Sequence, residues 1–238
     1  MLKNIKFIPF FILMVLFVNG QESNDTINRL DEKGLKQGYW IKYGEGGLLK
    51  YEGRFVDDIP QGEFIYYYPD EKVKARSEFS QGGDYVKTTT YHYSGNIMTK
   101  GFYKNKEKDS LWTYYNSEGT LLTEEFYLHN KKDGNWKTYY DNGQVSEEIT
   151  WDKGKRNGPW KQYYADGAIK TQGAFADDEK HGLIEFYYPN GRIQITGTYD
   201  KSYRVGEWHY MDEQSRVVKI EYYSADGELT REESFDYD

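Results

Sequence analysis

The sequence predicts an all-β protein: an elongated, single-layer antiparallel ribbon of β-hairpins, built from about eight units of 24 residues. Three observations predict this fold. One pattern recurs every 24 residues between residues 38 and 229. The chain holds 25 tyrosines and 24 glycines, a composition that suits strands separated by frequent turns. No segment of useful length between residues 38 and 223 has the apolar period of a helix.

The first 20 residues are typical of a secretory signal peptide. Lys3 and Lys6 give a positive start, Phe7 to Val18 is almost continuously apolar, and a cut is expected before Gln21. The apolar run is shorter than the about 20 residues of a membrane span, so an uncleaved anchor is the less favoured alternative. We therefore expect an exported protein, in the periplasm, in the cell envelope or secreted, with no integral membrane span in the mature chain.

Two short segments flank the expected repeat domain. Residues 21–37 are a polar N-terminal segment that we expect to cap the first edge of the ribbon. Residues 222–238 begin an irregular half-repeat, and their acidic side chains are expected to discourage other chains from pairing with the last edge. These acidic residues are Glu228, Glu232, Glu233, Asp236 and Asp238.

The repeat domain is expected to span residues 38–229, in units that start at residues 38, 62, 86, 110, 134, 158, 182 and 206. Positions within a unit are numbered from one. Position three reads Trp40, Phe64, Thr88, Trp112, Trp136, Trp160, Ile184 and Trp208. Position six is tyrosine in seven of eight units, although tyrosine is only about a tenth of the chain. Position eighteen is aromatic in every unit. Composition alone does not produce such regularity.

The sequence pattern of each unit predicts two strands joined by a tight turn. Gly143, Gly167 and Gly191 occupy position ten, and each follows Asn or Asp. Asn-Gly and Asp-Gly favour a two-residue hairpin turn, because both residues can take a positive φ. A looser turn, such as residues 128–134 or 152–158, is expected to lead into the next unit.

A two-residue turn would fix the pairing of the strands. Position seven would face twelve, five would face fourteen, and three would face sixteen. Trp40 would then lie across from Gly53, and Trp160 across from Gly173, with the large ring covering the glycine. About sixteen strands at about 4.8 Å each would give a ribbon roughly 75 Å long before twist.

Both faces of the ribbon are expected to carry aromatic rings. Positions three, five, seven, twelve, fourteen, sixteen and eighteen would share one face, and the tyrosine at position six would point the other way, beside polar residues at position fifteen. The position-three tryptophans and the position-eighteen aromatics are interpreted chiefly as cross-strand packing residues; the tryptophans are Trp40, Trp112, Trp136, Trp160 and Trp208. The candidate binding residues are Tyr43, Tyr67, Tyr91, Tyr115, Tyr139, Tyr163 and Tyr187, for which a purely structural role stays equally open.

The unit G-x-W-x-x-Y-Y-x-x-G-x-(aliphatic)-x-x-E, seen at residues 134–148 as "GNWKTYYDNGQVSEE", resembles the MORN-repeat variant of YwqK-like antitoxin-component proteins. The resemblance covers about residues 38–235. It implies a non-enzymatic ribbon of hairpins that binds another protein, such as a toxin. An exported copy would have to meet that partner in the periplasm or outside the cell.

The sequence predicts no active site, no cofactor and no metal site. His92, His129, His181 and His209 occupy unrelated positions in the repeat, without a spacing that would set two on one face as metal ligands. The acidic pairs, such as Glu124-Glu125, consist of strand neighbours that point to opposite faces, so they are interpreted as solvated repeat residues. We therefore expect that the protein is not an enzyme.

The net charge limits the classes of partner that the protein is expected to bind, and the cysteine content limits its covalent cross-links. The formal charge of −8 would become −10 on loss of the two lysines of the signal peptide. Such a surface disfavours nucleic acid and favours a basic partner, and the absence of cysteine excludes disulfides. The expected function is a protein-binding scaffold, antitoxin-like or immunity-like by resemblance. The alternative is a glycan-binding protein of the cell envelope that uses exposed Tyr and Trp side chains. The sequence makes no prediction of the oligomeric state.

Overall fold

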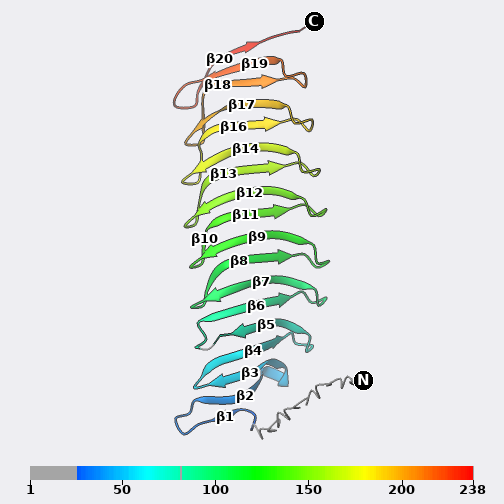
Figure 1. Ribbon diagram of the computed structural model, residues 1–238, viewed down its shortest axis with the longest axis vertical. Coiled ribbons are helices and arrows are strands. Elements are labelled where there is room, and N and C mark those ends of the chain that lie inside the picture. The colour runs from blue at the N-terminus through cyan, green and yellow to red at the C-terminus, as the bar shows by residue number, and fades with distance from the viewer. Residues whose placement is uncertain (1–25, 81, 238) are drawn as a thin grey trace, which may run out of the picture.

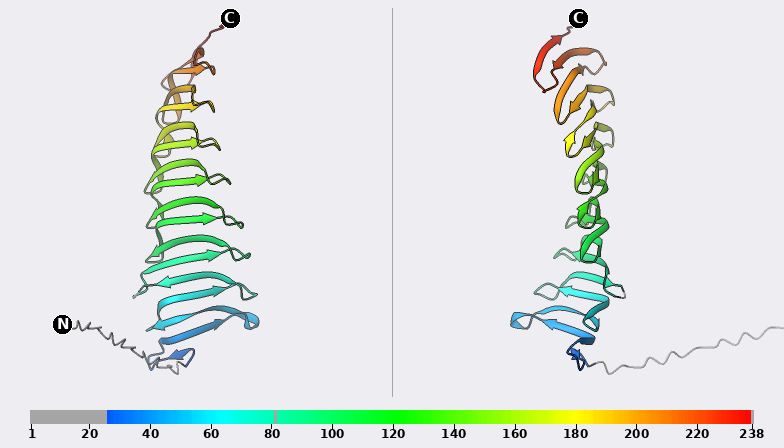
Figure 2. Two further views of the ribbon diagram at one scale, coloured as in Figure 1. Left: turned by 45° about the vertical axis from the view of Figure 1, so that its right-hand side comes forward. Right: turned by 90° about the vertical axis from the view of Figure 1, so that its left-hand side faces the viewer.

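The computed structural model describes residues 26–80 and 82–237, so the predicted signal peptide lies outside the described residues. The described residues form one antiparallel sheet of 20 strands, in which strands pair with their neighbours along the chain (Figure 1). The hairpins stack along one long axis, and side views show a single twisted layer (Figure 2). The predicted all-β, single-layer hairpin ribbon is confirmed.

The eight units supply sixteen strands, one hairpin each. The hairpins are β2 (Lys36–Tyr43) with β3 (Leu49–Val56), β4 (Ile59–Tyr67) with β5 (Val73–Phe79), β6 (Tyr85–Tyr91) with β7 (Ile97–Lys104), β8 (Glu107–Tyr115) with β9 (Leu121–Leu128), β11 (Gly134–Tyr139) with β12 (Val145–Asp152), β13 (Lys155–Tyr163) with β14 (Ile169–Ala176), β16 (Gly182–Tyr187) with β17 (Ile193–Asp200), and β18 (Tyr203–Met211) with β19 (Val217–Tyr223). The short strands β10 (Lys131–Lys132) and β15 (Glu179–Lys180) come just before β11 and β16 in the chain. Strand β10 pairs with β9, and β15 pairs with β14. Strands β1 (Arg29–Leu30) and β20 (Leu229–Ser234) flank the ribbon.

The two edges of the ribbon are covered by the flanking segments. At the first edge, β1 pairs with Lys36 and Gln37 of β2, and the N–H of Asn28 donates to the carbonyl of Tyr39 (2.9 Å). At the other end, β20 pairs with β19 over its whole length. The outer edge of β20 is therefore the last edge of the described sheet.

The hairpin tips differ from the predicted two-residue turn. In the fifth unit the N–H of Tyr140 donates to the carbonyl of Gln144 (2.8 Å), and the N–H of Gly143 donates back to Tyr140 (2.9 Å). Gly143 has a φ of 82°, whereas Asn142 before it does not take a positive φ. This is a three-residue loop ending in a left-handed glycine, one residue longer than predicted. Position six therefore pairs with twelve, as Tyr139 does with Val145, and the predicted pairing of seven with twelve is wrong.

Two-residue turns with positive φ occur instead in the connections between units. They are Asp57–Asp58, Asn105–Lys106, His129–Asn130, Lys153–Gly154, Asp177–Asp178 and Lys201–Ser202. The expected looser connection is therefore wrong at these six places. The residues are chiefly Asp, Asn, Lys and Ser rather than glycine, so the strain of a positive φ has to be offset by other bonds.

Reciprocal hydrogen bonds join four of these six connections to the residue that lies beside them in the preceding connection. The N–H of Asp178 donates to the carbonyl of Arg156 (2.9 Å), and its carboxylate accepts the N–H of Arg156 (2.9 Å). The same two-bond arrangement joins Asp58 to Lys36, Asn130 to Lys108, and Ser202 to Lys180. These bonds fix the residue at position twenty-three, two residues before each unit begins.

The predicted pairing of position three with position sixteen is confirmed. Trp40 lies opposite Gly53, and Trp160 lies opposite Gly173. The ring that covers the glycine, however, comes from the next unit: a Cβ on Gly53 would lie 2.5 Å from the ring of Phe64. The prediction that the opposite ring covers the glycine is therefore wrong, because the contact joins successive units rather than the two strands of one hairpin.

This contact between units builds the core. Phe64, Trp112, Ile184 and Trp208 each lie on a glycine of the preceding unit, and each is at most 3% exposed. Positions three, five, fourteen, sixteen and eighteen form what we call the aromatic face. Along it, rings from positions three and eighteen pack at centroid distances such as 5.0 Å between Phe55 and Phe64. In the described residues, the buried apolar core of the sheet is thus this row of position-three and position-eighteen side chains.

Candidate functional site

The tyrosines at position six, predicted as binding residues, lie on the face opposite the aromatic face. The hydroxyl of Tyr139 donates to Glu124 (2.9 Å) and that of Tyr163 donates to Glu148 (2.9 Å). Further along, Tyr187 accepts a bond from Gln172 (2.6 Å). Each bond links a tyrosine to position fifteen of the preceding unit, so the predicted placement of these two rows side by side is confirmed.

The remaining members of this row have different surroundings. Tyr67 donates to Glu52 (2.5 Å), and Lys100 lies 5.8 Å from the ring of Tyr115. Tyr91 is half-buried, and Tyr43 is 54% exposed. Burial and the hydrogen-bonded carboxylates raise the pKa of Tyr67, Tyr139, Tyr163 and Tyr187 to about 12. Near neutral pH these hydroxyls are therefore protonated, and most of them are used within the ribbon.

A second set of tyrosines, at position seven, ties each hairpin tip to the next. The hydroxyl of Tyr140 donates to the carbonyl of Tyr163 (2.7 Å), and that of Tyr164 donates to Tyr187 (2.6 Å). Tyr68, His92 and Tyr188 make the equivalent contact, at 2.8–2.9 Å. Sequence reasoning missed this role, although the recurring Tyr-Tyr pair was its signal.

A row of basic residues at position twenty-three lies over the aromatic face. The ammonium of Lys132 is 4.2 Å from the ring of Trp136 and 4.3 Å from that of Trp151, within cation–π distance. The row comprises Lys36, Lys108, Lys132, Arg156, Lys180 and Arg204. Sequence reasoning missed it too, although a basic residue recurs every 24 residues from Lys108 to Arg204.

A shallow groove of about 860 Å³ opens on the aromatic face across the fifth and sixth units. We call it the central groove. Its walls include Lys132, Trp136, Glu147, Trp151, Arg156, Trp160, Gln162, Phe175, Asp178, Lys180 and Phe186. Three of the six tryptophans of the chain, Trp136, Trp151 and Trp160, line this one depression.

The groove has a cause in the sequence. Position sixteen, which holds a glycine beneath Trp112 and Trp208, is Glu125 in the unit before Trp136. Without a glycine to receive it, the ring of Trp136 stays half-buried, whereas Trp112 and Trp208 are 3% and 0% exposed. The break in the glycine pattern therefore leaves an indole ring accessible in the middle of the ribbon.

The polar groups of the central groove are fixed by hydrogen bonds. The carboxylate of Glu147 accepts from the indole N–H of Trp160 (2.9 Å) and from the amide of Gln162 (3.1 Å). The guanidinium of Arg156 donates to Asp178 (3.1 Å). Such a surface can bind a ligand through indole rings, ammonium groups and a held carboxylate. Among the described residues, no three His, Asp or Glu side chains converge to hold a metal ion.

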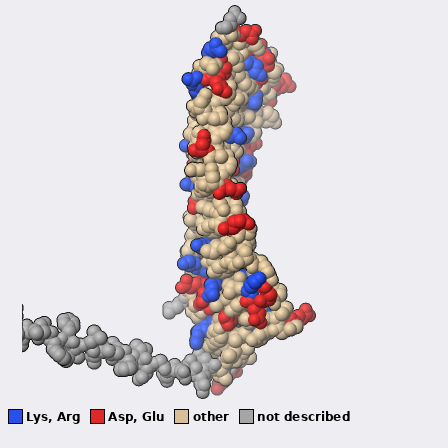
Figure 3. All heavy atoms as spheres, turned by 90° about the vertical axis from the view of Figure 1, so that its right-hand side faces the viewer, with Lys and Arg blue, Asp and Glu red and all other residues tan. Residues whose placement is uncertain are grey.

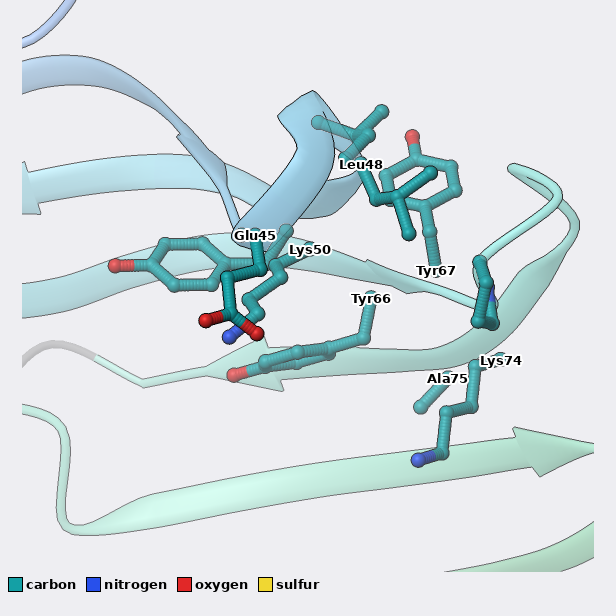
Figure 4. A pocket seen from close by; sticks show the side chains of 11 residues that line it. Glu45, Leu48, Lys50, Tyr66, Tyr67, Lys74 and Ala75 are labelled. Atoms are coloured by element: carbon teal, nitrogen blue, oxygen red, sulfur yellow. The ribbon is translucent and has the colours of Figure 1, made fainter.

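A second depression, of about 650 Å³, lies beside the first hairpin tip. Gly44 occupies position seven there, and the tip turns through the short 3₁₀ segment η1 (Glu45–Gly47). Figure 4 shows Glu45 and Lys50 gathered beside the ring of Tyr66, with Leu48 next to Tyr67. Burial raises the pKa of Tyr66. This depression is lined mainly by tyrosine rings and aliphatic side chains, without the tryptophans of the central groove.

The fold and these surfaces define a class: a repeat protein of stacked two-stranded units. A family model described as "MORN repeat variant" matches residues 60–81, 86–105, 132–153, 156–177 and 180–201. The chain therefore contains five repeats of the MORN-variant type, and the predicted resemblance to it is confirmed. In the described residues, no helix is both long and apolar enough to cross a membrane.

No curated protein matches the sequence. Among solved structures, a chain of the complex described as "Crystal Structure of TcdB2-TccC3-Cdc42" is similar over 87% of this chain, with 11% sequence identity and a TM-score of 0.23. The present chain spans 14% of the length of that chain. A likeness of this size carries no argument about function.

Proposed function

We propose that the protein is a non-catalytic scaffold that binds another protein at the central groove. The observation that carries the proposal is the pair of half-buried indoles, Trp136 and Trp151, whose ring centroids are 5.4 Å apart beneath the ammonium of Lys132. Trp and Arg are enriched among the residues that contribute most to protein–protein affinity. A sheet stabilised by the bonds between its units holds them in place before a partner arrives, which lowers the cost of binding.

The charges around the groove support a protein partner over a sugar. Sugar rings stack on open aromatic faces, but Lys132 lies over both Trp136 and Trp151. The net charge of −8 supports a basic partner for the chain as a whole, while the groove itself carries both signs, with Lys132, Arg156 and Lys180 beside Glu147 and Asp178. Figure 3 views the side of the hairpin tips, where acidic side chains recur along the ribbon with lysines and arginines among them. These acidic groups would speed the approach of a basic protein.

We further propose an antitoxin-like or immunity-like role, in which the partner is a toxin. Its support is the match to the MORN repeat variant and the resemblance of the unit at residues 134–148 to antitoxin components. The signal-peptide pattern of residues 1–20 supports export, so the meeting place would be the periplasm, the cell envelope or the outside of the cell.

The test is affinity capture from the native envelope fraction with residues 21–238, followed by mass spectrometry. The groove variant combines Lys132→Ala with Trp136→Ala. Its matched control combines Lys36→Ala with Trp40→Ala, the same two repeat positions in the first unit. We expect one protein to be recovered by the wild type and the control, and at least tenfold less by the groove variant. Recovery of no stable protein, or equal recovery by both variants, would reject the proposal.

A glycan-binding function is the second candidate, favoured by the half-exposed row of position-six tyrosines. It predicts weak binding to polysaccharide arrays that is lost in a variant combining Tyr139→Ala and Tyr163→Ala. Absence of binding to every glycan on the array would remove this candidate and leave the protein-binding proposal unaffected.

A further inference from the structure

The row of rings on the aromatic face is interrupted in the third unit. Position three is Thr88 there, the smallest residue at that position in any unit, and position sixteen of the preceding unit is Ser77 in place of glycine. The two side chains are 8% and 6% exposed, and their hydroxyls are hydrogen-bonded to each other (3.0 Å). A hydroxyl pair thus stands where three other units place a ring on a glycine: Phe64 on Gly53, Trp112 on Gly101 and Trp208 on Gly197.

The neighbouring unit shows what normally fills this space. Phe64, at position three of the second unit, packs between Phe55 and Phe79, with both centroid distances at 5.0 Å. In the third unit the space between the position-eighteen rings Phe79 and Tyr103 is instead a depression of about 290 Å³. We call this depression the third-unit slot. Its lining residues are Ser77, Phe79, Val86, Thr88, Tyr103 and Lys106.

The chemistry of the slot suits an aromatic ring. Two aromatic rings and Val86 give apolar walls, and aromatic rings favour edge-to-face or offset packing at such distances. The hydroxyls of Ser77 and Thr88 are hydrogen-bonded to each other, so each polar atom of the floor already has a partner. Lys106 lines the rim, and a lysine beside a bound ring would resemble the cation–ring contacts of the other units.

We propose that the third-unit slot binds one aromatic side chain of a partner protein. Thr88 has no ring and lies on the floor of the slot, hydrogen-bonded to Ser77. A ring on residue 88 itself would collide with the Cβ of Ser77. A Cβ on the equivalent Gly53 would come within 2.5 Å of the ring of Phe64. A ring that enters from solvent avoids this position. The slot is separate from the central groove, so the inference goes beyond the proposed function and does not depend on it.

The test uses residues 21–238 and three probes: N-acetyltryptophanamide, N-acetylphenylalaninamide and N-acetylleucinamide. Binding is followed by the chemical shifts of Ser77, Val86 and Thr88. We expect the two aromatic amides to shift these resonances selectively, with at least threefold weaker binding of the leucine amide. No selective shift, or equal binding of all three probes, would overturn the proposal.

Two variants make the assignment specific. Combining Ser77→Gly with Thr88→Phe recreates the Gly53–Phe64 arrangement, so it should fold, fill the slot and abolish binding of the aromatic amides. Phe79→Leu keeps an apolar wall but removes its ring, and it should weaken binding at least threefold even if the double variant fails to fold. Undiminished binding in both variants would overturn the proposal that the third-unit slot binds an aromatic ring. Capture of a partner at the central groove would be unaffected by either variant.

Discussion

The indole of Trp208 lies so close to Gly197 that a Cβ on that glycine would be 2.3 Å from the ring atom Cδ2. Trp208 is 0% exposed, so the ring has no room to move toward solvent. The glycine belongs to β17 and the tryptophan to β18, which are strands of successive units. The choice of residue at position sixteen therefore affects how closely the next unit's ring can approach the strand.

This relationship predicts that Gly197→Ala destabilises the ribbon. Overpacking a buried contact typically costs about 1–3 kcal/mol, and we expect the upper part of that range because the contact is with the rigid ring of Trp208. Gly173→Ala is the matched control, since its Cβ would meet Ile184 at 3.3 Å, a distance that a small shift relieves. Urea unfolding of the two variants measures the difference. Equal losses of stability would contradict this account of the core.

Much of the fold follows from the sequence because a fixed period constrains every unit at once. Trp40 and Gly53 pair as predicted, since repetition and a short turn leave few other registers. The two turn types lie at each other's predicted places, with the two-residue turns between units and the longer loops at the hairpin tips. Asn-Gly suits the two-residue turn, but Gly143 alone takes the positive φ here, while Asp57 and Asp58 take it without any glycine.

The candidate site was less predictable because it depends on contacts between units. Trp136 was correctly placed on the aromatic face, but its exposure depends on Glu125, eleven residues earlier and in another unit. The position-six tyrosines were correctly placed beside position fifteen, yet the sequence did not show that Tyr139 and Tyr163 donate their hydroxyls to it. The periodic lysines and arginines were visible in the sequence, and only the structure shows them over the rings.

The tyrosine–carboxylate bonds predict an alkaline transition. Burial and the bonded carboxylates raise the pKa of Tyr39, Tyr67, Tyr139, Tyr163 and Tyr187 from 10.0 to about 12. A raised pKa in the folded state gives stability that is complete below pH 10 and lost as the pH rises through about 12. Tyrosine absorbance at 295 nm and far-ultraviolet circular dichroism should therefore change together in this window.

The control for this prediction is Tyr163→Phe, which removes the hydroxyl bonded to Glu148 and keeps the ring. It should lose about 1 kcal/mol of stability at pH 7 and depend less on alkaline pH than the wild type. Ionisation of all tyrosines near pH 10 with an unchanged dichroism spectrum would show that the hydroxyls are not held as described.

The lowered pKa of Glu221 predicts that the folded protein loses stability at low pH. Its burial alone would raise the pKa, but bonds from Lys219 (2.6 Å), Tyr210 and Tyr223 (2.9 Å) outweigh burial and lower the pKa from 4.5 to about 2. A lowered pKa gives stability that is present above about pH 4.5 and lost as the pH falls through about 2.

We expect Glu221→Gln to be less stable than the wild type by on the order of 2 kcal/mol at pH 7, since solvent screening reduces the full effect of the shift. The difference should shrink between pH 4.5 and pH 2. Thermal unfolding across this range measures it, with the exposed Glu228→Gln as the control. A difference that does not depend on pH would assign the loss to packing instead.

The connections between units predict unequal roles for two neighbouring aspartates. Asp178 accepts the N–H (2.9 Å) and Nε–H (3.1 Å) of Arg156, whereas the carboxylate of Asp177 contacts only the exposed Lys155 (3.0 Å). Both aspartates have a positive φ, so both alanine variants share that strain, and Asp178→Ala should lower the melting temperature by about 2–4 °C more than Asp177→Ala does. Asp178→Asn keeps an oxygen for the backbone N–H and should recover most of the loss.

The same pair of variants links the connection to the central groove, because Arg156 lines the groove and Asp178 holds its guanidinium. If the charged contact matters for recognition, Asp178→Asn should stay folded and keep the bond from the guanidinium to the carbonyl of residue 178 (2.8 Å), but hold Arg156 less firmly, and it should capture less of a groove-bound partner than Asp177→Ala does. Equal capture by the two variants, with equal melting temperatures, would mean that Arg156 is held by the carbonyl of residue 178 (2.8 Å) and by its cation–π contact with Phe175 (4.3 Å), and not by the carboxylate of Asp178.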